Sequence, residues 1–194
     1  MTTPDLSGIA RWPNVPACYG WLSLDRRGQW RMRGEIVTHT GLATFLNRQY
    51  GHDEHGNYFV QNGPQRVFVE LDYTPWILRL TSGKALQTHT GEAVEDIRAA
   101  AFDEEGNLLL EFANGIGLLC DRDLPAMLDC LRQPDDTTAD DAALLGLLDL
   151  APGTLSPLTL RWNGKKVPVS MLQRSGVALR YRFVSAPADP EHKE

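Results

Sequence analysis

The sequence predicts an α+β protein that is rich in β-strands, built from two similar units of β-hairpins and a helix with mostly antiparallel sheets. Three observations predict this fold. Short segments alternate apolar and polar residues, as half-buried strands do, and glycine-containing turns separate them. Similar turn motifs also recur along the chain, which indicates an internal repeat.

The recurring motifs align in two registers. Two pairs lie fifty residues apart: Asp-Glu-x-Gly-Asn at 53–57 and 103–107, and Thr-His-Thr-Gly at 38–41 and 88–91. The second register matches residues 24–30 to residues 102–108, and a predicted helix follows each of these segments. The second register fits the predicted elements better, because the first Thr-His-Thr-Gly opens a helix while the other alternates like a strand. A duplication with one fixed alignment stays an open alternative.

The chain is expected to divide into four parts: an extended arm (residues 1–20), a first sheet-and-helix unit (21–83), a second such unit (84–184) and a disordered tail (185–194). The boundary is placed at the Thr-Ser-Gly of residues 81–83, which breaks the strand pattern. Within the second unit, residues 135–150 add an acidic connector and an apolar helix.

The first unit begins with a strand near Tyr19 and a turn at residues 25–28, where glycine favours a positive φ. A short strand at 35–37 precedes a helix that Thr38 or Thr40 caps and that Gly51 ends. The remaining predicted elements are a turn at 52–57 and strands at 58–61, 66–71 and 76–80.

The second unit repeats this plan with further elements. Its predicted strands are residues 97–102, 108–112, 116–120, 158–162, 165–169 and 177–184, the last from its alternating Val, Leu, Tyr and Phe residues. Asp121 is expected to cap a helix that continues to Leu131.

Charge and composition exclude several classes of protein. The net charge is −6, and it divides into −12 over residues 85–150 and +6 over residues 151–184. A negative chain is repelled by phosphate, which argues against nucleic acid as a partner. No apolar run is long enough to span a membrane, and the first twenty residues lack a secretory leader pattern. Three cysteines without paired spacing, and arginine well in excess of lysine, favour a cytoplasmic protein of a GC-rich bacterial genome.

No motif in the chain predicts a catalytic centre. His52 and His55 stand three residues apart, but no further histidine or cysteine cluster completes a metal site, so we expect no metal ligand and no cofactor. The sequence therefore favours a non-enzymatic binding or regulatory module. The alternative is an enzyme of unidentified class that uses His39, His52 or Asp53.

The predicted ligand site is an aromatic corner formed by Trp30, Tyr58, Tyr73 and Trp76, with Arg66 beside it. Aromatic rings next to a cation suit an anionic or planar ligand, or a peptide. The alternative for the same residues is a plain hydrophobic core with Arg66 on the outer face. The sequence alone leaves both alternatives open.

The segment from Asp140 to Leu150 carries more leucine and alanine than one face of a short helix needs. That apolar surface either packs within the chain or forms a homo-oligomer contact, which would make the protein a structural subunit.

Three motifs of the first half carry a family resemblance: Asp-x-x-Gly-x-Trp at 25–30, Asp-Glu-x-Gly-Asn-Tyr at 53–58 and Asp-x-x-Pro-Trp at 72–76. The chain resembles a group of uncharacterised proteobacterial proteins of unknown function that have repeated structural motifs and a link to signalling. The resemblance covers residues 19–131 and is thinner after the first half. It supplies no catalytic residue. The chain departs from the group by inserting residues 135–150 and by having Trp76 where phenylalanine is commoner.

Overall fold

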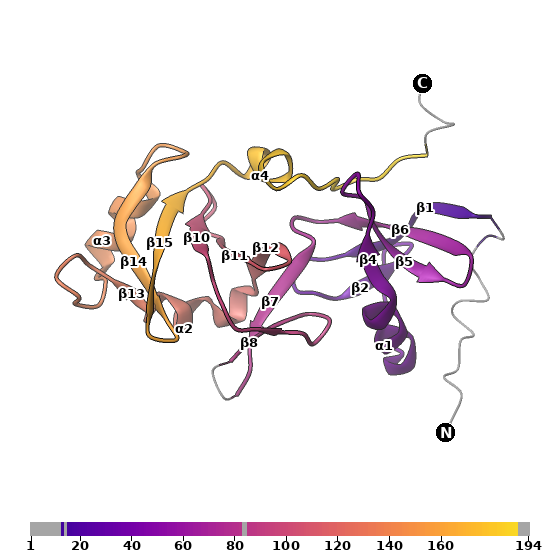
Figure 1. Cartoon of the computed structure of the whole chain (residues 1–194), viewed down its shortest axis with the longest axis horizontal. Coiled ribbons are helices and arrows are strands. Elements are labelled where there is room, and N and C mark those ends of the chain that lie inside the picture. Colours follow the sequence, from indigo (N-terminus) through magenta and orange to yellow (C-terminus); the bar gives the residue numbers. More distant parts are fainter. Residues whose placement is uncertain (1–12, 14, 83–84, 190–194) are drawn as a thin grey trace. The chain divides into compact units, whose positions relative to one another are not determined.

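The computed structural model describes residue 13 and residues 15–82 and 85–189 (Figure 1). The chain forms two compact units. Unit 1 comprises residues 1–75, 89–91 and 182–194, and unit 2 comprises residues 76–88 and 92–181. The predicted α+β fold is confirmed, because each unit has a mixed, mainly antiparallel sheet accompanied by helices. The units divide after Pro75 rather than at residues 81–83, because β7 pairs with β12 of the second sheet.

Unit 1 contains one sheet with the strand order β3-β2-β1-β6-β5-β4. Its elements are β1 (Ala17–Leu24), β2 (Trp30–Met32), β3 (Glu35–Ile36), α1 (Thr40–Gln49), β4 (Tyr50–His52), β5 (Tyr58–Asn62) and β6 (Gln65–Leu71). The β1–β6 pair is parallel, and the other pairs are antiparallel. Alternate strand residues such as Leu22, Leu24, Val67 and Val69 are fully buried and form the core under α1, which contributes Leu46.

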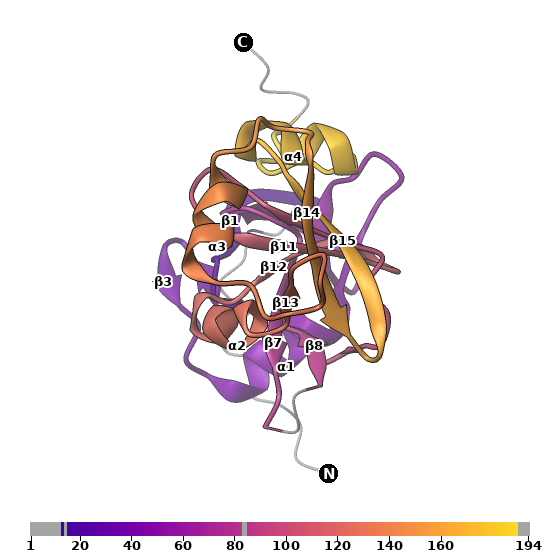
Figure 2. The same ribbon diagram turned by 90° about the vertical axis from the view of Figure 1, so that its left-hand side faces the viewer.

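Unit 2 contains a sheet with the strand order β13-β14-β15-β10-β11-β12-β7-β8-β9. Its strands are β7 (Trp76–Leu80), β8 (Leu86–Thr88), β9 (Ala93–Val94), β10 (Ala99–Phe102), β11 (Leu108–Phe112), β12 (Gly115–Leu119), β13 (Leu131–Arg132), β14 (Leu155–Trp162) and β15 (Lys165–Met171). Its helices are the 3-10 helix η2 (Asp121–Asp123) and three α-helices, which Figure 2 labels: α2 (Leu124–Leu128), α3 (Asp141–Leu148) and α4 (Arg174–Tyr181).

Six strands of the second sheet follow the order of the first sheet. The order β12-β11-β10-β15-β14-β13 aligns with the order β3-β2-β1-β6-β5-β4. At each step the two neighbouring strands have the same relative orientation in both sheets: the central pair is parallel and the other pairs are antiparallel. In β1, Leu24 pairs with Trp30, and in β10, Phe102 pairs with Leu108. The pairing therefore follows the register that matches residues 24–30 to residues 102–108.

Three turns share one hydrogen-bonding pattern. In each, a carboxylate oxygen of the first aspartate accepts from the backbone N–H groups two and four residues later, as Asp103 Oδ1 accepts from Glu105 at 3.0 Å and Asn107 at 2.9 Å. Asp25 and Asp53 make the same bonds in their turns. A glycine with φ between 74° and 80° occupies the fourth position, where another residue would be strained.

Several predicted boundaries are wrong for identifiable reasons. Residues 177–184 were expected to form a strand, but residues up to Tyr181 belong to α4, whose Ala, Leu and Arg residues favour a helix and of which only Val177 is fully buried. The helix expected to reach Leu131 ends at Leu128, because Leu131 pairs with Leu160 in the sheet. His39, rather than a threonine, caps α1 by accepting from Leu42 N at 3.1 Å.

The prediction of a disordered tail from residue 185 is wrong at its first residue. Val184 bridges to Asn57, and Ser185 O accepts from Leu71 N at 2.8 Å, so this segment is part of unit 1. Residues 190–194 lie outside the described residues, as do residues 1–12 and 14 of the predicted arm. Within the described part of the chain, no helix is long and apolar enough to cross a membrane.

Candidate functional site

The aromatic residues of the predicted corner are interior residues. Trp30, Tyr58, Tyr73 and Trp76 are each at most 6% exposed. Trp76 belongs to unit 2, where its Nε1 donates to Asn114 O at 3.0 Å and its ring meets Phe112 edge-on. Their burial favours the alternative of a hydrophobic core, and ligand binding by these residues stays a prediction.

Trp30 and Tyr58 belong to one ring cluster of unit 1, together with Tyr50 and His89. The ring of Tyr50 lies 5.3 Å from each of the other three rings. Trp30 Nε1 donates to Asn47 Oδ1 at 2.7 Å, and the Tyr50 hydroxyl donates to Pro75 O at 2.8 Å. Burial, and secondarily the neighbouring Tyr58, raises the pKa of Tyr50 well above its usual value. The hydrogen-bonded polar groups of Trp30 and Tyr50 among packed rings are typical of a structural core.

The other two predicted residues of unit 1 each make a cation–π contact. The Arg66 guanidinium lies 4.6 Å from the ring centre of Phe59, and Arg66 is exposed. The ring of Tyr73 is covered by Arg26 at 5.6 Å. Arg66 is therefore available at the surface, while Tyr73 is not.

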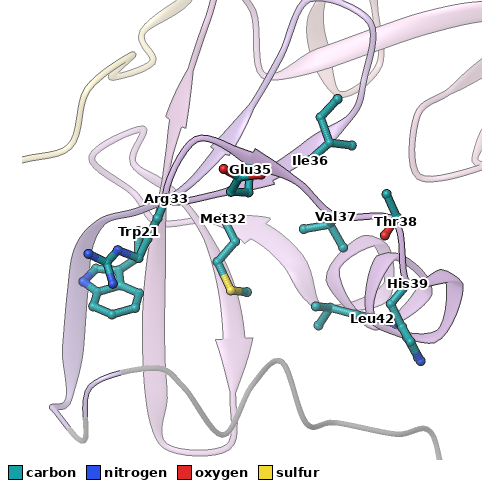
Figure 3. Close-up of a pocket in the computed structure, with 9 residues that line it drawn as sticks. All are labelled: Trp21, Met32, Arg33, Glu35, Ile36, Val37, Thr38, His39 and Leu42. Carbon is teal, nitrogen blue, oxygen red and sulfur yellow. The ribbon is translucent and has the colours of Figure 1, made fainter.

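A pocket of about 570 Å³ lies elsewhere in unit 1, beside β1, β2, β3 and the start of α1 (Figure 3). Its lining residues are Trp21, Met32, Arg33, Glu35, Ile36, Val37, Thr38, His39 and Leu42. Met32, Val37 and Leu42 point toward a common space, and the Arg33 guanidinium lies 4.8 Å over the Trp21 ring. The pocket thus combines apolar walls with charged groups at its rim.

No sequence pattern predicted this pocket. Trp21 and Arg33 are twelve positions apart, but they are neighbours across the first hairpin, where Arg33 N donates to Trp21 O at 2.8 Å. The strand predicted near Tyr19 and the turn predicted at residues 25–28 already indicated that hairpin. No sequence pattern predicted the pocket wall that α1 forms, because the position of Leu42 in the pocket depends on how α1 packs on the sheet.

The residues considered for catalysis are engaged in local structure. His39 Nδ1 caps α1, and the ring of His52 packs 5.1 Å from that of Tyr58. For Asp53, desolvation is the largest single influence and raises the pKa, but hydrogen bonds from Asn57 and His55 outweigh it and leave the pKa below its usual value. Asp53 is therefore an ionised turn residue. Among the described residues, no three His, Cys, Asp or Glu side chains form a group that could hold a metal ion.

Comparisons with known proteins give a family and a fold. The DUF2944 family model, described as "Protein of unknown function (DUF2946)", matches residues 5–188. No curated protein matches the chain.

Two crystal structures of DUF1285 family proteins are similar to the chain. The one from Silicibacter pomeroyi DSS-3 has a TM-score of 0.52 and 12% identity, covering 88% of this chain and 89% of that one. The one from Shewanella baltica OS155 has a TM-score of 0.43 and 15% identity, covering 55% of this chain and 89% of that one. At these identities the first similarity shows the fold alone, and the second carries no argument.

Proposed function

The chain belongs to the family of unknown function whose model spans residues 5–188, and we propose that it is a non-enzymatic binding module whose ligand site is the pocket of unit 1. The observation that carries the proposal is the pocket itself. Its volume of about 570 Å³ lies in the range of small-molecule sites, which are mostly apolar with a few polar groups. Neither the family description nor the structural neighbours name a signalling role, so we do not extend the proposal to signalling.

The pocket supports binding of a group with an apolar body. Met32 and Val37 are only partly covered by the rest of unit 1, so a bound apolar group would remove them further from water. Arg33 stacked on Trp21 offers a cation next to a ring, which favours an aromatic or anionic end of the ligand.

The enzyme alternative has less support. Of the residues named for it, His39 caps a helix, the His52 ring packs on Tyr58, and Asp53 closes a turn. Burial raises the pKa values of the Cys18 and Cys120 thiols, which keeps them protonated and weakly nucleophilic.

Anilinonaphthalene sulfonate, which has apolar rings and an anionic group, tests the pocket. We expect saturable fluorescence enhancement with the full chain, and loss of most of it in Val37→Glu, because a charge would stand on the apolar wall. Leu179→Glu is the matched control, since Leu179 is an exposed apolar residue of unit 2 that lies in neither proposed binding surface. Equal enhancement in Val37→Glu and the native chain would refute the site.

A second candidate role is that of a subunit in a homo-oligomer. In α3, Leu145 is 65% exposed and Leu148 is 43% exposed, and on β14 Leu155 is 71% exposed. Exposed leucines on adjoining elements are typical of surfaces that associate. This contact would not use the pocket and can coexist with binding there.

We further propose that the two units are an internal repeat and that the protein is a cytoplasmic bacterial one. The shared strand order and the Asp-x-x-Gly turns support the repeat. The three free cysteines are consistent with a reducing compartment, and the similar structures come from bacteria.

A further inference from the structure

The shared strand order gives each residue of β3 a counterpart in β12. Arg31 follows Trp30 and pairs with Ile36, while Leu109 follows Leu108 and pairs with Leu118. Trp30 pairs with the last residue of β1, and Leu108 pairs with the last residue of β10. Trp30 therefore corresponds to Leu108, and Ile36 corresponds to Leu118.

In unit 2, the outer side of β12 is covered by β7. The two strands run parallel, with Trp76, Ile77 and Leu78 opposite Gly117, Leu118 and Leu119. Cys120 N donates to Leu78 O at 2.8 Å, and Ile77 and Leu78 are at most 1% exposed. An extended apolar segment therefore completes this side of the sheet.

In unit 1, β3 is the end strand of the sheet among the described residues. Val37 N donates to Trp30 O at 2.8 Å, which directs the backbone of Val37 toward β2. Because N–H and C=O groups of successive strand residues point to opposite sides, those of Ile36 point away from the sheet. Ile36 is 43% exposed. The edge of β3 thus offers a backbone donor and acceptor at Ile36, whose counterpart Leu118 pairs with β7 in unit 2.

The pocket lies at this same edge. Glu35, Ile36, Val37 and Thr38 are among its lining residues, and Leu42 of α1 closes one wall. In unit 2, the N-cap residue of α2, Asp123, accepts from Leu80 N at 3.0 Å through its Oδ2. In unit 2 this region receives β7, whereas in unit 1 it contains a cavity of about 570 Å³.

We propose that β3 and the adjoining pocket accept an extended apolar segment of a protein partner, which adds a parallel strand opposite Glu35, Ile36 and Val37. This inference rests on the proposed function of the pocket and names its ligand class. Backbone hydrogen bonds to Ile36 would hold the segment, and its alternate side chains would enter the pocket. A second copy of the chain fits less well, because two identical edges related by a two-fold axis pair antiparallel, while the β7–β12 pair is parallel.

The probe is a labelled peptide with the sequence of residues 74–81, Thr-Pro-Trp-Ile-Leu-Arg-Leu-Thr, because this segment contains β7. Fluorescence polarisation would measure its binding to the full chain. We expect saturable binding that competes with anilinonaphthalene sulfonate. Ile36→Pro should weaken the peptide about tenfold by removing the outward N–H, while Ile36→Thr, which keeps that N–H, should bind as the native chain does.

Methylated peptides provide a second, independent control. In β7, Thr81 N donates to Ala85 O on the β8 side, so the N–H groups of Ile77 and Arg79 also face β8 and that of Leu78 faces β12. An N-methyl group at the Leu78 position should therefore weaken the peptide about tenfold, and one at the Ile77 position should have little effect.

The outcomes separate the inference from the proposed function. If the sulfonate binds at the pocket and the peptide does not, the strand addition is wrong and the pocket function stands. If neither binds, both are wrong. Peptide binding that Ile36→Pro leaves unchanged would place the peptide elsewhere and overturn the inference. A dimer that dissociates in Ile36→Pro would show that a second copy occupies the edge, which also overturns it.

Discussion

At the scale of single residues, the Asp-x-x-Gly turns account for much of the local structure. Asp103 is fully buried, yet its carboxylate is stabilised by backbone N–H groups and by Asn107 Nδ2 at 2.7 and 2.9 Å. Each turn connects two antiparallel strands, so the aspartate fixes the register of its hairpin.

Gly56 and Gly106 test what a turn glycine contributes besides its backbone freedom. Both have φ near 80°, but an added Cβ at Gly56 would lie 2.2 Å from Arg182 O, while nothing lies within 4 Å at Gly106. Gly106→Ala should lower the free energy of unfolding by about 1–2 kcal/mol from strain alone. Gly56→Ala should lower it by about 1–3 kcal/mol more from the clash, as measured by denaturant unfolding. Equal losses would contradict the contact with Arg182.

Asp53 should contribute to the pH dependence of the free energy of unfolding. Its pKa is lowered in the folded protein, so its contribution is complete above the unfolded pKa of about 3.9 and is lost as the pH falls through the folded value. Asp53→Asn should therefore lose less stability than the native chain between pH 5 and pH 2. Denaturant midpoints of both proteins measured across this range would check it. Parallel curves would show that Asp53 does not contribute.

At the scale of elements, α3 exposes much of its apolar surface, because Leu145 and Leu148 are both exposed. Asp140 caps it by accepting from Ala143 N at 2.8 Å, and Leu147 packs inward. In the sequence the helix lies between β13 and β14, where unit 1 has only the turn at residues 53–57.

The proposed oligomer contact at Leu145 and Leu148 of α3 can be tested by substitution. Leu145→Glu with Leu148→Glu should convert an oligomer into monomers, because charges would replace the exposed leucines. Sedimentation velocity would measure the change, and Leu179→Glu, which alters the 86% exposed residue of α4, is the control. A native chain that sediments as a monomer would rule out this role.

At the scale of the whole molecule, the chain passes between the units more than once, so unit 1 is not one continuous segment. Residues after Tyr181 complete it: Phe183 is 7% exposed, and the bonds of Val184 and Ser185 reach Gly56 and Leu71. The stability of unit 1 therefore depends on the last part of the sequence.

Truncation tests this dependence. A chain ending at Tyr181 should lose about 2–4 kcal/mol of stability in unit 1, because the burial of Phe183 and two backbone hydrogen bonds disappear. Hydrogen exchange should become faster at Leu71 and its neighbours in β6 but not in β14 or β15. A chain ending at Asp189 keeps these contacts and is the control. Unchanged exchange at Leu71 in the shorter chain would contradict the role of this segment.

The ion pairs of unit 2 also belong to the whole-molecule scale. The acidic middle of the sequence pairs with its basic end, as Arg161 and Lys166 contact Asp136 and Arg174 contacts Glu105. These side chains are partly exposed, so each pair contributes little and salt weakens it. The basic side chains of these pairs are therefore neutralised by acidic side chains of the same unit.

The sequence by itself determined the fold class and most strand positions, and it favoured the register that matches residues 24–30 to residues 102–108, because glycine turns and alternating residues act over a few neighbours. It also predicted the helix from Asp140, whose capping is local. Only the tertiary structure decided that β7 joins the second sheet, that α4 is helical, and that the predicted aromatic residues are core. These outcomes depend on pairing between distant segments. The pocket was beyond sequence reasoning for the same reason, since packing of α1 against β2 and the segment after β3 creates it.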